Sequence, residues 1–389
     1  MAVNSPSVRA GRHVLHLFGW FRPEFTGEGR YVESIAPLLA AQGVVNDVAV
    51  TATRAPAELP ALPGIRAVHY FGHGFHGPGR INLPLLWWLL WHVRDYDVVH
   101  LHAQIDRYFL PQLIARLAGR RVIQSCTLAD GMGSLLDSYR GFWRFIPRML
   151  IGCIDMVVAI SLALRDDNLR VLPPQRVVLI PQGVFLPPET TTDRAAARAR
   201  WGIGPDDCVL LFVGGLCARK GVRTLVDAMP GLLADTPRLR LLIVGPDLEP
   251  DYAAGLRAAA APLGDAVIFA GFQERATEFY RLADMLVFAS YQEGFGNVLL
   301  EAMAARVPVI CRRLPGGTDW ILDNGKLGLL FDDDAEYPAL VRRLAADPAA
   351  RAALAAAGRR KVEQQFEMST VAARYVALYE NATEVSTPS

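Results

Sequence analysis

The sequence has little lysine, little net charge and no cysteine pattern typical of a disulfide framework or a metal site. Only three of its 40 basic residues are lysines (Lys220, Lys326 and Lys361), so a lysine inside a motif is informative. The formal net charge of +1 argues against nucleic acid as a partner, because duplex binding usually needs a strong basic excess. The five cysteines are odd in number and lack metal-ligand spacing, which favours a reducing, cytoplasmic compartment.

Long apolar runs are also missing. No uncharged stretch reaches the roughly 18 residues that a transmembrane helix needs. No cleavage pattern follows the apolar residues 14–21, which we interpret as a first buried strand. Residues 83–91 are apolar around a whole helical circumference, and residues 142–146 are aromatic and basic. Either segment is a candidate for peripheral contact with the inner face of a membrane. Packing inside the first domain is the alternative.

What the sequence does have is a regular alternation of short apolar runs and helical stretches. A length of 389 residues fits two or three domains. The alternation predicts βαβ units and parallel sheets. The predicted strands are 13–18, 47–51, 98–102, 122–125, 156–160, 177–180, 209–213, 239–244, 267–269, 285–288 and 307–310. The predicted helices are 32–42, 110–118, 219–228, 276–283, 298–305, 337–345 and 349–382.

Residues 182–192 interrupt this rhythm with glycine, proline and threonine, as a linker does. We therefore expect an α/β protein of two Rossmann-like, doubly wound domains facing a cleft. The first domain covers residues 1–185 and the second residues 186–369, followed by a helix and tail at 370–389. Ligands of such sheets bind at the carboxyl ends of the strands.

The segment from Glu293 to Glu301 is the most informative one. A glycine-bracketed turn with Gly294 and Gly296 follows a predicted strand and leads directly into a helix near Asn297. The free amides of that helix start can face an anion, and one carboxylate can lie on each side of it. This pattern suits a nucleotide sugar, whose hydroxyls flank a diphosphate. The alternative is that both glutamates are solvated residues at a helix end.

A second signal follows the strand at 210–213. Gly214 and Gly215 precede Arg219 and Lys220, which stand together near a predicted helix start. Cations there oppose the helix dipole, so stability alone does not explain them. A diphosphate would neutralise them, and arginine can bind it in bidentate fashion. The alternative is an exposed charged turn.

Taken as a set, these motifs resemble the retaining glycosyltransferases of family 4. The resemblance rests on the Glu-x7-Glu segment with its Ala-Met-Ala continuation, the Gly-Gly-Leu and Arg-Lys-Gly turn, and the segments 155–161, 180–184, 307–310 and 325–331. It implies the GT-B fold, with the last helix returning to the first domain. It also implies that Arg219 and Lys220 bind the donor diphosphate, that Glu301 binds the ribose and that Glu293 contacts the transferred sugar.

By the same resemblance, the backbone from Gly294 through Phe295 and Gly296 to Asn297 would cradle the sugar and phosphate. The cations and amides would replace a metal ion, so no metal and no cofactor is expected beside the nucleotide sugar. We interpret the Asp-x-Asp at residues 332–334 as a solvated loop. Four positions depart from the family pattern: Gly215 where arginine is common, Gln182 for asparagine, Arg306 for glycine and Asp319 for glutamate.

Candidate acceptor residues lie in the first half. Gly27 and Gly29 follow the first strand; a third glycine, which NAD binding would need, is replaced by Val32. By resemblance this loop closes over the donor phosphates or the acceptor. The histidine that relatives carry after the strand at 122–125 is absent, and Thr127 and Asp130 are the substitutes we consider.

Two further candidates stand near strand ends. His100 and His102 alternate on a predicted strand and should face opposite sides, with His102 nearer the ligand edge. Arg165 could meet an acidic acceptor or be a surface charge.

The predicted function is transfer of a sugar from a nucleotide diphosphate sugar to a saccharide or lipid-linked acceptor, in polysaccharide or glycoconjugate synthesis. Two alternatives stay open at this point: a nucleotide-sugar epimerase, and a donor-binding subunit without activity.

Overall fold

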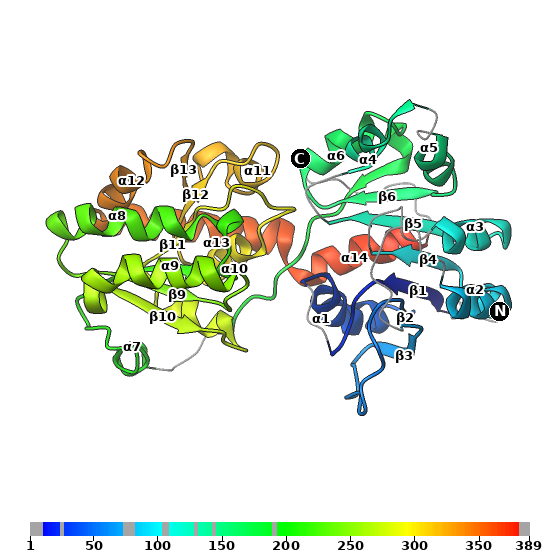
Figure 1. Ribbon diagram of the computed structural model, residues 1–389, viewed down its shortest axis with the longest axis horizontal. Coiled ribbons are helices and arrows are strands. Elements are labelled where there is room, and N and C mark those ends of the chain that lie inside the picture. The colour runs from blue at the N-terminus through cyan, green and yellow to red at the C-terminus, as the bar shows by residue number, and fades with distance from the viewer. Residues whose placement is uncertain are drawn as a thin grey trace, which may run out of the picture. The chain divides into compact units, whose positions relative to one another are not determined.

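The computed structural model describes residues 11–23, 27–72, 82–102, 109–127, 131–141, 145–188 and 193–380. The chain divides into two compact units (Figure 1). The N-terminal unit comprises Met1–Gln182 and Met368–Ser389, and the C-terminal unit comprises Gly183–Glu367. Each unit is built around one parallel sheet, which confirms the α/β fold of two Rossmann-like halves.

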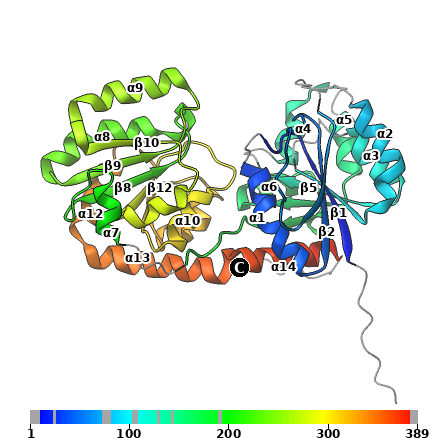
Figure 2. The same cartoon turned by 90° about the horizontal axis from the view of Figure 1, so that it is seen from below.

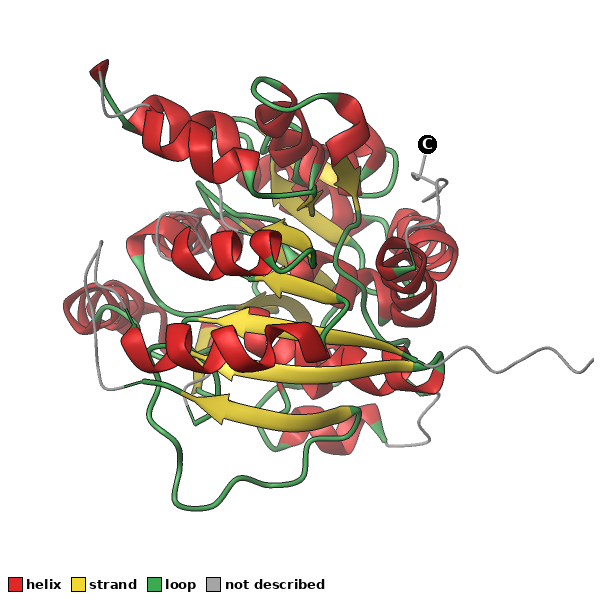
Figure 3. Cartoon of the chain, turned by 90° about the vertical axis from the view of Figure 1, so that its right-hand side faces the viewer, coloured by secondary structure: helices red, strands yellow, loops and turns green. Residues whose placement is uncertain are grey.

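The sheet of the N-terminal unit has the order β3-β2-β1-β4-β5-β6-β7. Helices cover both of its faces (Figure 3). α1 and α14 lie together on one side, and α2 and α3 lie together on the other (Figure 2). Its strands are β1 (Arg12–Phe18), β2 (Val44–Val50), β3 (Ile65–Tyr70), β4 (Val98–Leu101), β5 (Arg121–Cys126), β6 (Met156–Ala159) and β7 (Val177–Leu179). Its helices are α1 (Gly27–Ala41), α2 (Leu83–His92), α3 (Phe109–Leu117), α4 (Met132–Ser138), α5 (Phe145–Gly152), α6 (Leu162–Leu169) and α14 (Met368–Tyr379).

The sheet of the C-terminal unit has the order β10-β9-β8-β11-β12-β13. Helices α8 and α9 lie together on one face, and α10 and α13 lie together on the other. Its strands are β8 (Cys208–Val213), β9 (Leu239–Val244), β10 (Val267–Gly271), β11 (Met285–Phe288), β12 (Val309–Arg312) and β13 (Leu329–Phe331). Its helices are α7 (Arg194–Ala199), α8 (Val222–Asp235), α9 (Pro250–Ala260), α10 (Asn297–Ala304), α11 (Thr318–Ile321), α12 (Tyr337–Ala346) and α13 (Pro348–Lys361).

A core of buried aliphatic side chains holds the helices of the N-terminal unit against its sheet. In the N-terminal unit, Val14, Val98 and Ile123 of three neighbouring strands pack with Ile35 of α1 and Val371 of α14. The last helix of the chain is therefore part of the core of the first unit. Among the helices that the structure describes, none is both long enough and apolar enough to cross a bilayer.

Several element boundaries differ from the prediction. The edge strand β3 was not predicted, and the predicted helix 276–283 is a 3-10 segment, η7 (Ala276–Leu282). The long C-terminal helix is interrupted: a π turn at Val362–Phe366 and an extended Glu367, with φ −63° and ψ 137°, separate α13 from α14. An extended residue ends the hydrogen-bond ladder, so composition alone suggested one helix where there are two.

Candidate functional site

Two neighbouring strand ends form the candidate donor site of the C-terminal unit. β8 and β11 pair in parallel, so the loops that follow them leave the same edge of the sheet. The first loop leads through the 3-10 turn η5 (Ala218–Lys220), and the second leads into α10. The amide of Tyr291 donates to the carbonyl of Arg219 at 2.9 Å, which joins the two loops directly.

A glycine fixes where the cations of this site lie. Gly221 has φ +64°, and a Cβ there would lie 2.2 Å from the carbonyl oxygen of Ala289. Glycine alone fits such a left-handed, crowded position. Helix α8 consequently begins at Val222. The predicted helix start at residue 219 is wrong, because Arg219 and Lys220 lie on a separate turn in front of Gly221.

The two cations share one carboxylate. Lys220 Nζ lies 2.5 Å and Arg219 Nη1 lies 3.2 Å from Glu293 Oε1. Arg219 Nη1 also donates to the carbonyl of Gln292 at 2.5 Å. Lys220 and Glu293 are mostly enclosed, whereas the Arg219 side chain is 45% exposed. Two positive charges against one negative charge give this cluster of three residues a formal charge of +1, as suits an anion site, and the Glu249 carboxylate accepts from the amide of Ala218 on the same turn.

Helix α10 begins beside this cluster. Its N-cap is Gly296, with φ +111° and ψ 54°, and no side chain caps the helix, so its first amides lack a side-chain partner. Asn297 Oδ1 is buried without a hydrogen-bond partner. Phe295 is buried, with its ring 6.2 Å from those of Trp320 and Phe366. Phe295 thus anchors the loop, and only its backbone is placed to face a ligand.

The second glutamate lies one turn into α10, as predicted, and has a partner that the sequence did not suggest. The Tyr280 hydroxyl donates to Glu301 Oε2 at 2.7 Å. Burial raises the pKa of the Glu301 carboxyl, and the hydrogen bond from Tyr280 opposes that shift. Of the remaining predicted donor residues, Gly294 lies half-buried in the same loop, and Gly215 faces the flexible Leu248 side chain.

The candidate acceptor residues that the structure describes lie in the N-terminal unit, after β1 (Gly27 and Gly29), β4 (His102), β5 (Thr127) and β6 (Arg165). Gly27 and Gly29 do not form a loop but belong to the first turn of α1, which starts five residues earlier than predicted. Arg165 lies on α6 and pairs with Asp166 at 2.8 Å. Asp130 lies outside the described residues. The hydroxyl of Thr127 hydrogen-bonds the carboxyl of Glu28.

The prediction that His100 and His102 face opposite sides is wrong. Their ring centroids are 4.1 Å apart, and both side chains are buried. Successive side chains of a strand alternate, so residues two apart such as 100 and 102 point to the same side, and the prediction applied this rule the wrong way. Its ring stacks on Phe18 at 4.5 Å, with an interplanar angle of 7°.

A chain of hydrogen bonds fixes the proton positions of these histidines. The Asn46 Nδ2 donates to the carbonyl of Gly64 at 3.0 Å, so its Oδ1 accepts from His16 Nε2 at 3.1 Å. In a neutral imidazole the other nitrogen then accepts. His16 Nδ1 therefore accepts from His102 Nε2 at 2.9 Å, which leaves the lone pair of His102 Nδ1 facing Glu28 Oε1 at 3.5 Å.

The electrostatics of the cluster agree with this proton order. Burial lowers the pKa of His16 to about 4 and the pKa of His102 well below its usual value, so both are neutral at pH 7. Burial raises the pKa of Glu28 to about 8, so its carboxyl is protonated and can donate toward His102. Glu28 was missed from the sequence, although its position directly after Gly27 at the first strand–helix junction was a signal.

A small cavity of about 10 Å³, roughly the space of one water molecule, lies at this point. Its lining includes Glu28, His102, Ser125, Thr127 and Tyr375. The predicted acceptor candidates His102 and Thr127 are therefore brought together, and Arg165 is not among the lining residues.

The three buried histidines also meet the distance criterion for a metal site. One nitrogen from each of His16, His100 and His102 lies within 4.8 Å of the others. His100 bonds the Tyr379 hydroxyl through Nδ1 and the Ser125 hydroxyl through Nε2, both at 2.8 Å. Hydrogen bonds thus account for both nitrogens of His100, and we interpret the three histidines as a buried polar network.

Two family profiles match successive parts of the chain. "Glycosyl transferases group 1" matches residues 193–361, and "Glycosyltransferase Family 4" matches residues 25–186. The D-inositol 3-phosphate glycosyltransferase of Acidothermus cellulolyticus is 33% identical over 370 residues, which span 83% of this chain and 79% of that protein. The protein of the same name from Geodermatophilus obscurus is 31% identical over 400 residues, or 92% and 85% of the two chains.

Solved structures share the fold over nearly the whole length. Sucrose-phosphate synthase from Thermosynechococcus elongatus superposes with a TM-score of 0.74 at 26% identity, over 96% of this chain and all of that one. HepE of Anabaena, solved in complex with UDP, gives a TM-score of 0.78 at 19% identity, over 95% and 99% of the two chains.

Proposed function

The chain belongs to the glycosyl transferases group 1 family. On that premise we propose that it moves a sugar, with retention of anomeric configuration, from a nucleotide diphosphate sugar to a hydroxyl of a saccharide or lipid-linked acceptor. The observation that carries the proposal is the net positive cluster of Arg219, Lys220 and Glu293 beside the uncapped start of α10. HepE, with the same fold, was solved with UDP, which makes UDP the first nucleotide to test.

In this proposal the cluster binds the diphosphate without being rearranged. An ammonium group has three N–H donors, and Glu293 takes one of those of Lys220, which leaves two for phosphate oxygens. Arg219 adds an exposed guanidinium, and the amides at the start of α10 add the positive end of a helix dipole. These groups stabilise the charge that develops on the departing diphosphate.

The two glutamates have different tasks. Glu301, oriented by the hydroxyl of Tyr280, accepts hydrogen bonds from the ribose. Glu293 accepts from both cations through the same oxygen, which makes it a weak nucleophile and suits a positioning role toward the transferred sugar. Retention without a covalent intermediate then follows from attack on the face that the diphosphate leaves, with the leaving phosphate taking the proton of the acceptor hydroxyl.

We propose that one hydroxyl group of the acceptor enters the small cavity of the N-terminal unit, which has space for about one water molecule and not for a whole sugar. Glu28, His102 and Thr127 present a protonated carboxyl, an imidazole and a hydroxyl at the carboxyl ends of parallel strands. Such groups suit an uncharged hydroxylated acceptor. Gly27 and Gly29 allow close approach at the start of α1.

The central test is the Lys220→Ala substitution. If Lys220 acts mainly on the leaving group, turnover should fall about 10²–10³-fold, the scale of a lost oxyanion donor, and donor affinity should fall less. Steady-state kinetics with each of UDP-, GDP- and ADP-sugars gives both quantities. An unchanged turnover at saturating donor would limit Lys220 to ground-state binding.

Calorimetry with UDP separates the glutamates and the rival functions. Glu301→Ala should weaken UDP binding, whereas Glu293→Ala should spare it and reduce turnover. Equal UDP affinity in both variants and the wild type would remove the ribose assignment of Glu301. Nucleotide released without any acceptor would favour an epimerase, and donor binding with no transfer to any acceptor would favour a donor-binding subunit.

We also propose that α2 contacts the membrane that presents a lipid-linked acceptor. Its side chains Leu83, Trp87, Leu90 and Trp91 are exposed, each by more than half, and tryptophan favours the bilayer interface. Replacing Trp87 and Trp91 by serine should reduce sedimentation with anionic vesicles. Phe272→Ser, which removes an equally exposed apolar side chain from the C-terminal unit, is the control.

A further inference from the structure

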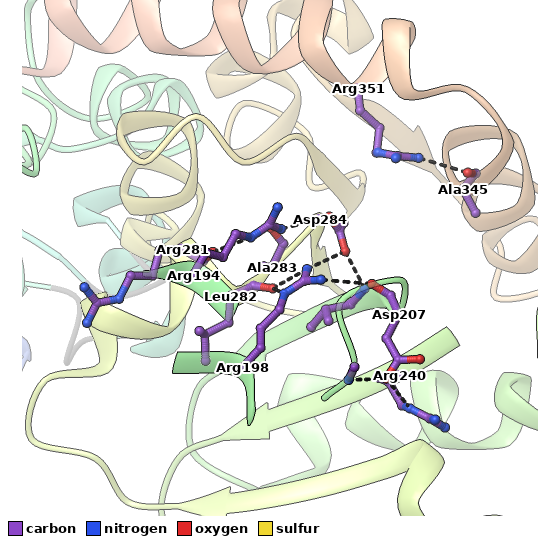
Figure 4. Close-up of polar contacts among 12 residues, drawn as sticks. Arg194, Arg198, Asp207, Arg240, Arg281, Leu282, Ala283, Asp284, Ala345 and Arg351 are labelled. Carbon is purple, nitrogen blue, oxygen red and sulfur yellow. Dashed lines mark hydrogen bonds and ion pairs between the residues drawn. The ribbon is translucent and has the colours of Figure 1, made fainter. Parts of the chain in front are cut away.

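A second, separate cavity lies in the C-terminal unit, at the edge of the sheet opposite the donor loops. Its volume is about 270 Å³. Ala283 and Asp284 lead into β11, Val307 and Pro308 lead into β12, and these amino-terminal ends of the strands form its floor. The polar lining consists of Arg194, Arg281, Arg306, Arg351, Asp284 and Tyr280. Figure 4 shows part of this region.

The charges of the lining are not balanced. Four arginines against one aspartate leave a formal charge of +3. Asp284 is moreover held twice, by Arg194 at 2.9 Å and by the buried Arg198 at 2.8 Å (Figure 4). The negative charge of Asp284 is therefore already neutralised by Arg194 and Arg198. Arg281, Arg306 and Arg351 need other anionic partners to neutralise their charges.

Those three arginines have few anionic partners among the described residues. Arg281 contacts Glu278 at 3.4 Å, and its Nε is buried without a hydrogen-bond partner. Arg351 donates to the carbonyls of Leu344 and Ala345 at 2.5 and 2.9 Å, and no carboxylate of the described chain forms an ion pair with it. The same holds for Arg306, which is exposed. Arg306 and Arg351 therefore line the cavity without a carboxylate partner among the described residues, and a guanidinium group in that state can bind a phosphate.

The backbone at Arg306 is the second observation. Arg306 has φ +59°, and its amide and that of Val307 donate to the carbonyls of Met303 and Ala302 at 3.1 and 2.8 Å. This is the turn that ends a helix with a left-handed residue, a position that favours glycine. An arginine there strains the backbone, yet it places a guanidinium at the mouth of the cavity.

Favourable interaction with the dipole of α10 is the simpler explanation for a cation at this helix end. It explains one positive charge and no more. It gives no reason for Arg351, from α13, to line the same cavity without a carboxylate partner.

We propose that this cavity binds a phosphate ester through Arg306 and Arg351, with Arg194 and Arg281 adding positive charge to its lining, as a site distinct from the donor loops. The phosphate is borne either by a soluble metabolite or by a phospholipid headgroup. Tyr280 connects the two sites, because it lines the cavity and its hydroxyl donates to Glu301 of the donor site. A ligand in the cavity would therefore contact a residue that holds Glu301.

The test is the Arg306→Gly variant of the full chain, in thermal unfolding titrations with inorganic pyrophosphate at constant ionic strength. Without pyrophosphate this variant should melt above the wild type, because glycine removes the backbone strain. With pyrophosphate, the wild type should gain stability, and the variant should need about tenfold more of the anion for the same gain. Arg306→Asn, which also tolerates the left-handed conformation, repeats the test with a second side chain.

Two controls distinguish pyrophosphate binding in this cavity from pyrophosphate binding elsewhere on the protein. Arg360→Ala removes an exposed arginine nine residues after Arg351, two and a half turns away and therefore on the opposite side of α13, and should behave as the wild type. Pyrophosphate also suits the donor loops, so the Arg306→Gly effect should persist in a Lys220→Ala background, where that contribution is removed.

The source of the phosphate is distinguished by a parallel arm with phosphatidylglycerol and phosphatidylcholine vesicles. An Arg306-dependent response to pyrophosphate alone supports a soluble ester. A response that appears only as Arg306-dependent sedimentation with phosphatidylglycerol supports a headgroup. If Arg306→Gly and the wild type respond equally to pyrophosphate and to both kinds of vesicle, the cavity is not a phosphate site and the proposal fails.

Discussion

Replacing Glu28 by glutamine should stabilise the protein, and by an amount that depends on pH. The Glu28 carboxyl is enclosed in the N-terminal unit, where burial raises its pKa from 4.5 to about 8. Above pH 4.5 the unfolded chain releases this proton, whereas the folded chain keeps it until about pH 8. Stability is therefore lost progressively across that window, at about 1.4 kcal/mol per pH unit.

At pH 7 the window has been crossed by 7.0 minus 4.5, or 2.5 pH units, which amounts to about 3 kcal/mol. Glutamine has the same shape, cannot ionise, and can donate its amide N–H to His102 Nδ1 as the protonated carboxyl does. Glu28→Gln should thus match the wild type near pH 4 and exceed it by about 3 kcal/mol at pH 7.

Urea unfolding at several pH values measures this difference, and the transition that moves with the substitution reports the N-terminal unit. Glu58→Gln, at an exposed position in the loop after β2, is the matched control and should give no pH-dependent difference. A Glu28→Gln effect that is constant between pH 4 and pH 8 would refute the reasoning, because it would mean that Glu28 ionises alike in the folded and unfolded chains.

Three further outcomes follow from the donor loops. Tyr280→Phe removes the donor to Glu301 and should weaken UDP binding about tenfold in calorimetry, with the fold intact by circular dichroism; unchanged affinity would contradict the proposed role of Glu301. Gly221→Ala should cost about 2 kcal/mol or more in urea unfolding, whereas Gly255→Ala inside α9, where a Cβ meets nothing within 4 Å, should stabilise by about 0.5–1 kcal/mol. Transfer should survive a chelator, since cations and amides replace the ion, and a loss restored by magnesium would show that the diphosphate site is misassigned.

Local pattern was sufficient for most of the strands and for the start of α10. Parallel strands buried on both faces are continuous apolar runs, and glycine-rich turns between a strand and a helix mark their carboxyl ends. The helix start near Asn297 and the position of Glu301 one turn later were both predicted from such signals. The edge strand β3 was missed because its side chains are mostly half-buried, so it lacks a continuous apolar run.

Contacts between residues far apart in the sequence could not be predicted from local pattern. Glu28 meets His102, 74 positions further on, and the resulting pKa depends on burial that no local pattern encodes. The side of the His102 ring, by contrast, could have been predicted, because residues two apart on a strand share a side and the prediction placed them on opposite sides. Arg198 and Asp284 lie 86 positions apart and form a buried pair that composition alone cannot indicate.

The structure also changes the interpretation of Arg306, from a residue of the donor site to a residue of the second cavity. In the sequence it is a departure from the family pattern five residues after Glu301, and we interpreted it as bearing on the donor site. A helix of eight residues, however, spans about 12 Å. Asn297 at its start faces the donor loops, and Arg306 after its end lies at the opposite edge of the sheet. Asn297 and Arg306 are near each other in sequence, but the helix between them places them at opposite edges of the sheet. An arginine at position 306 therefore adds a positive charge at the far edge and leaves the donor loops unchanged.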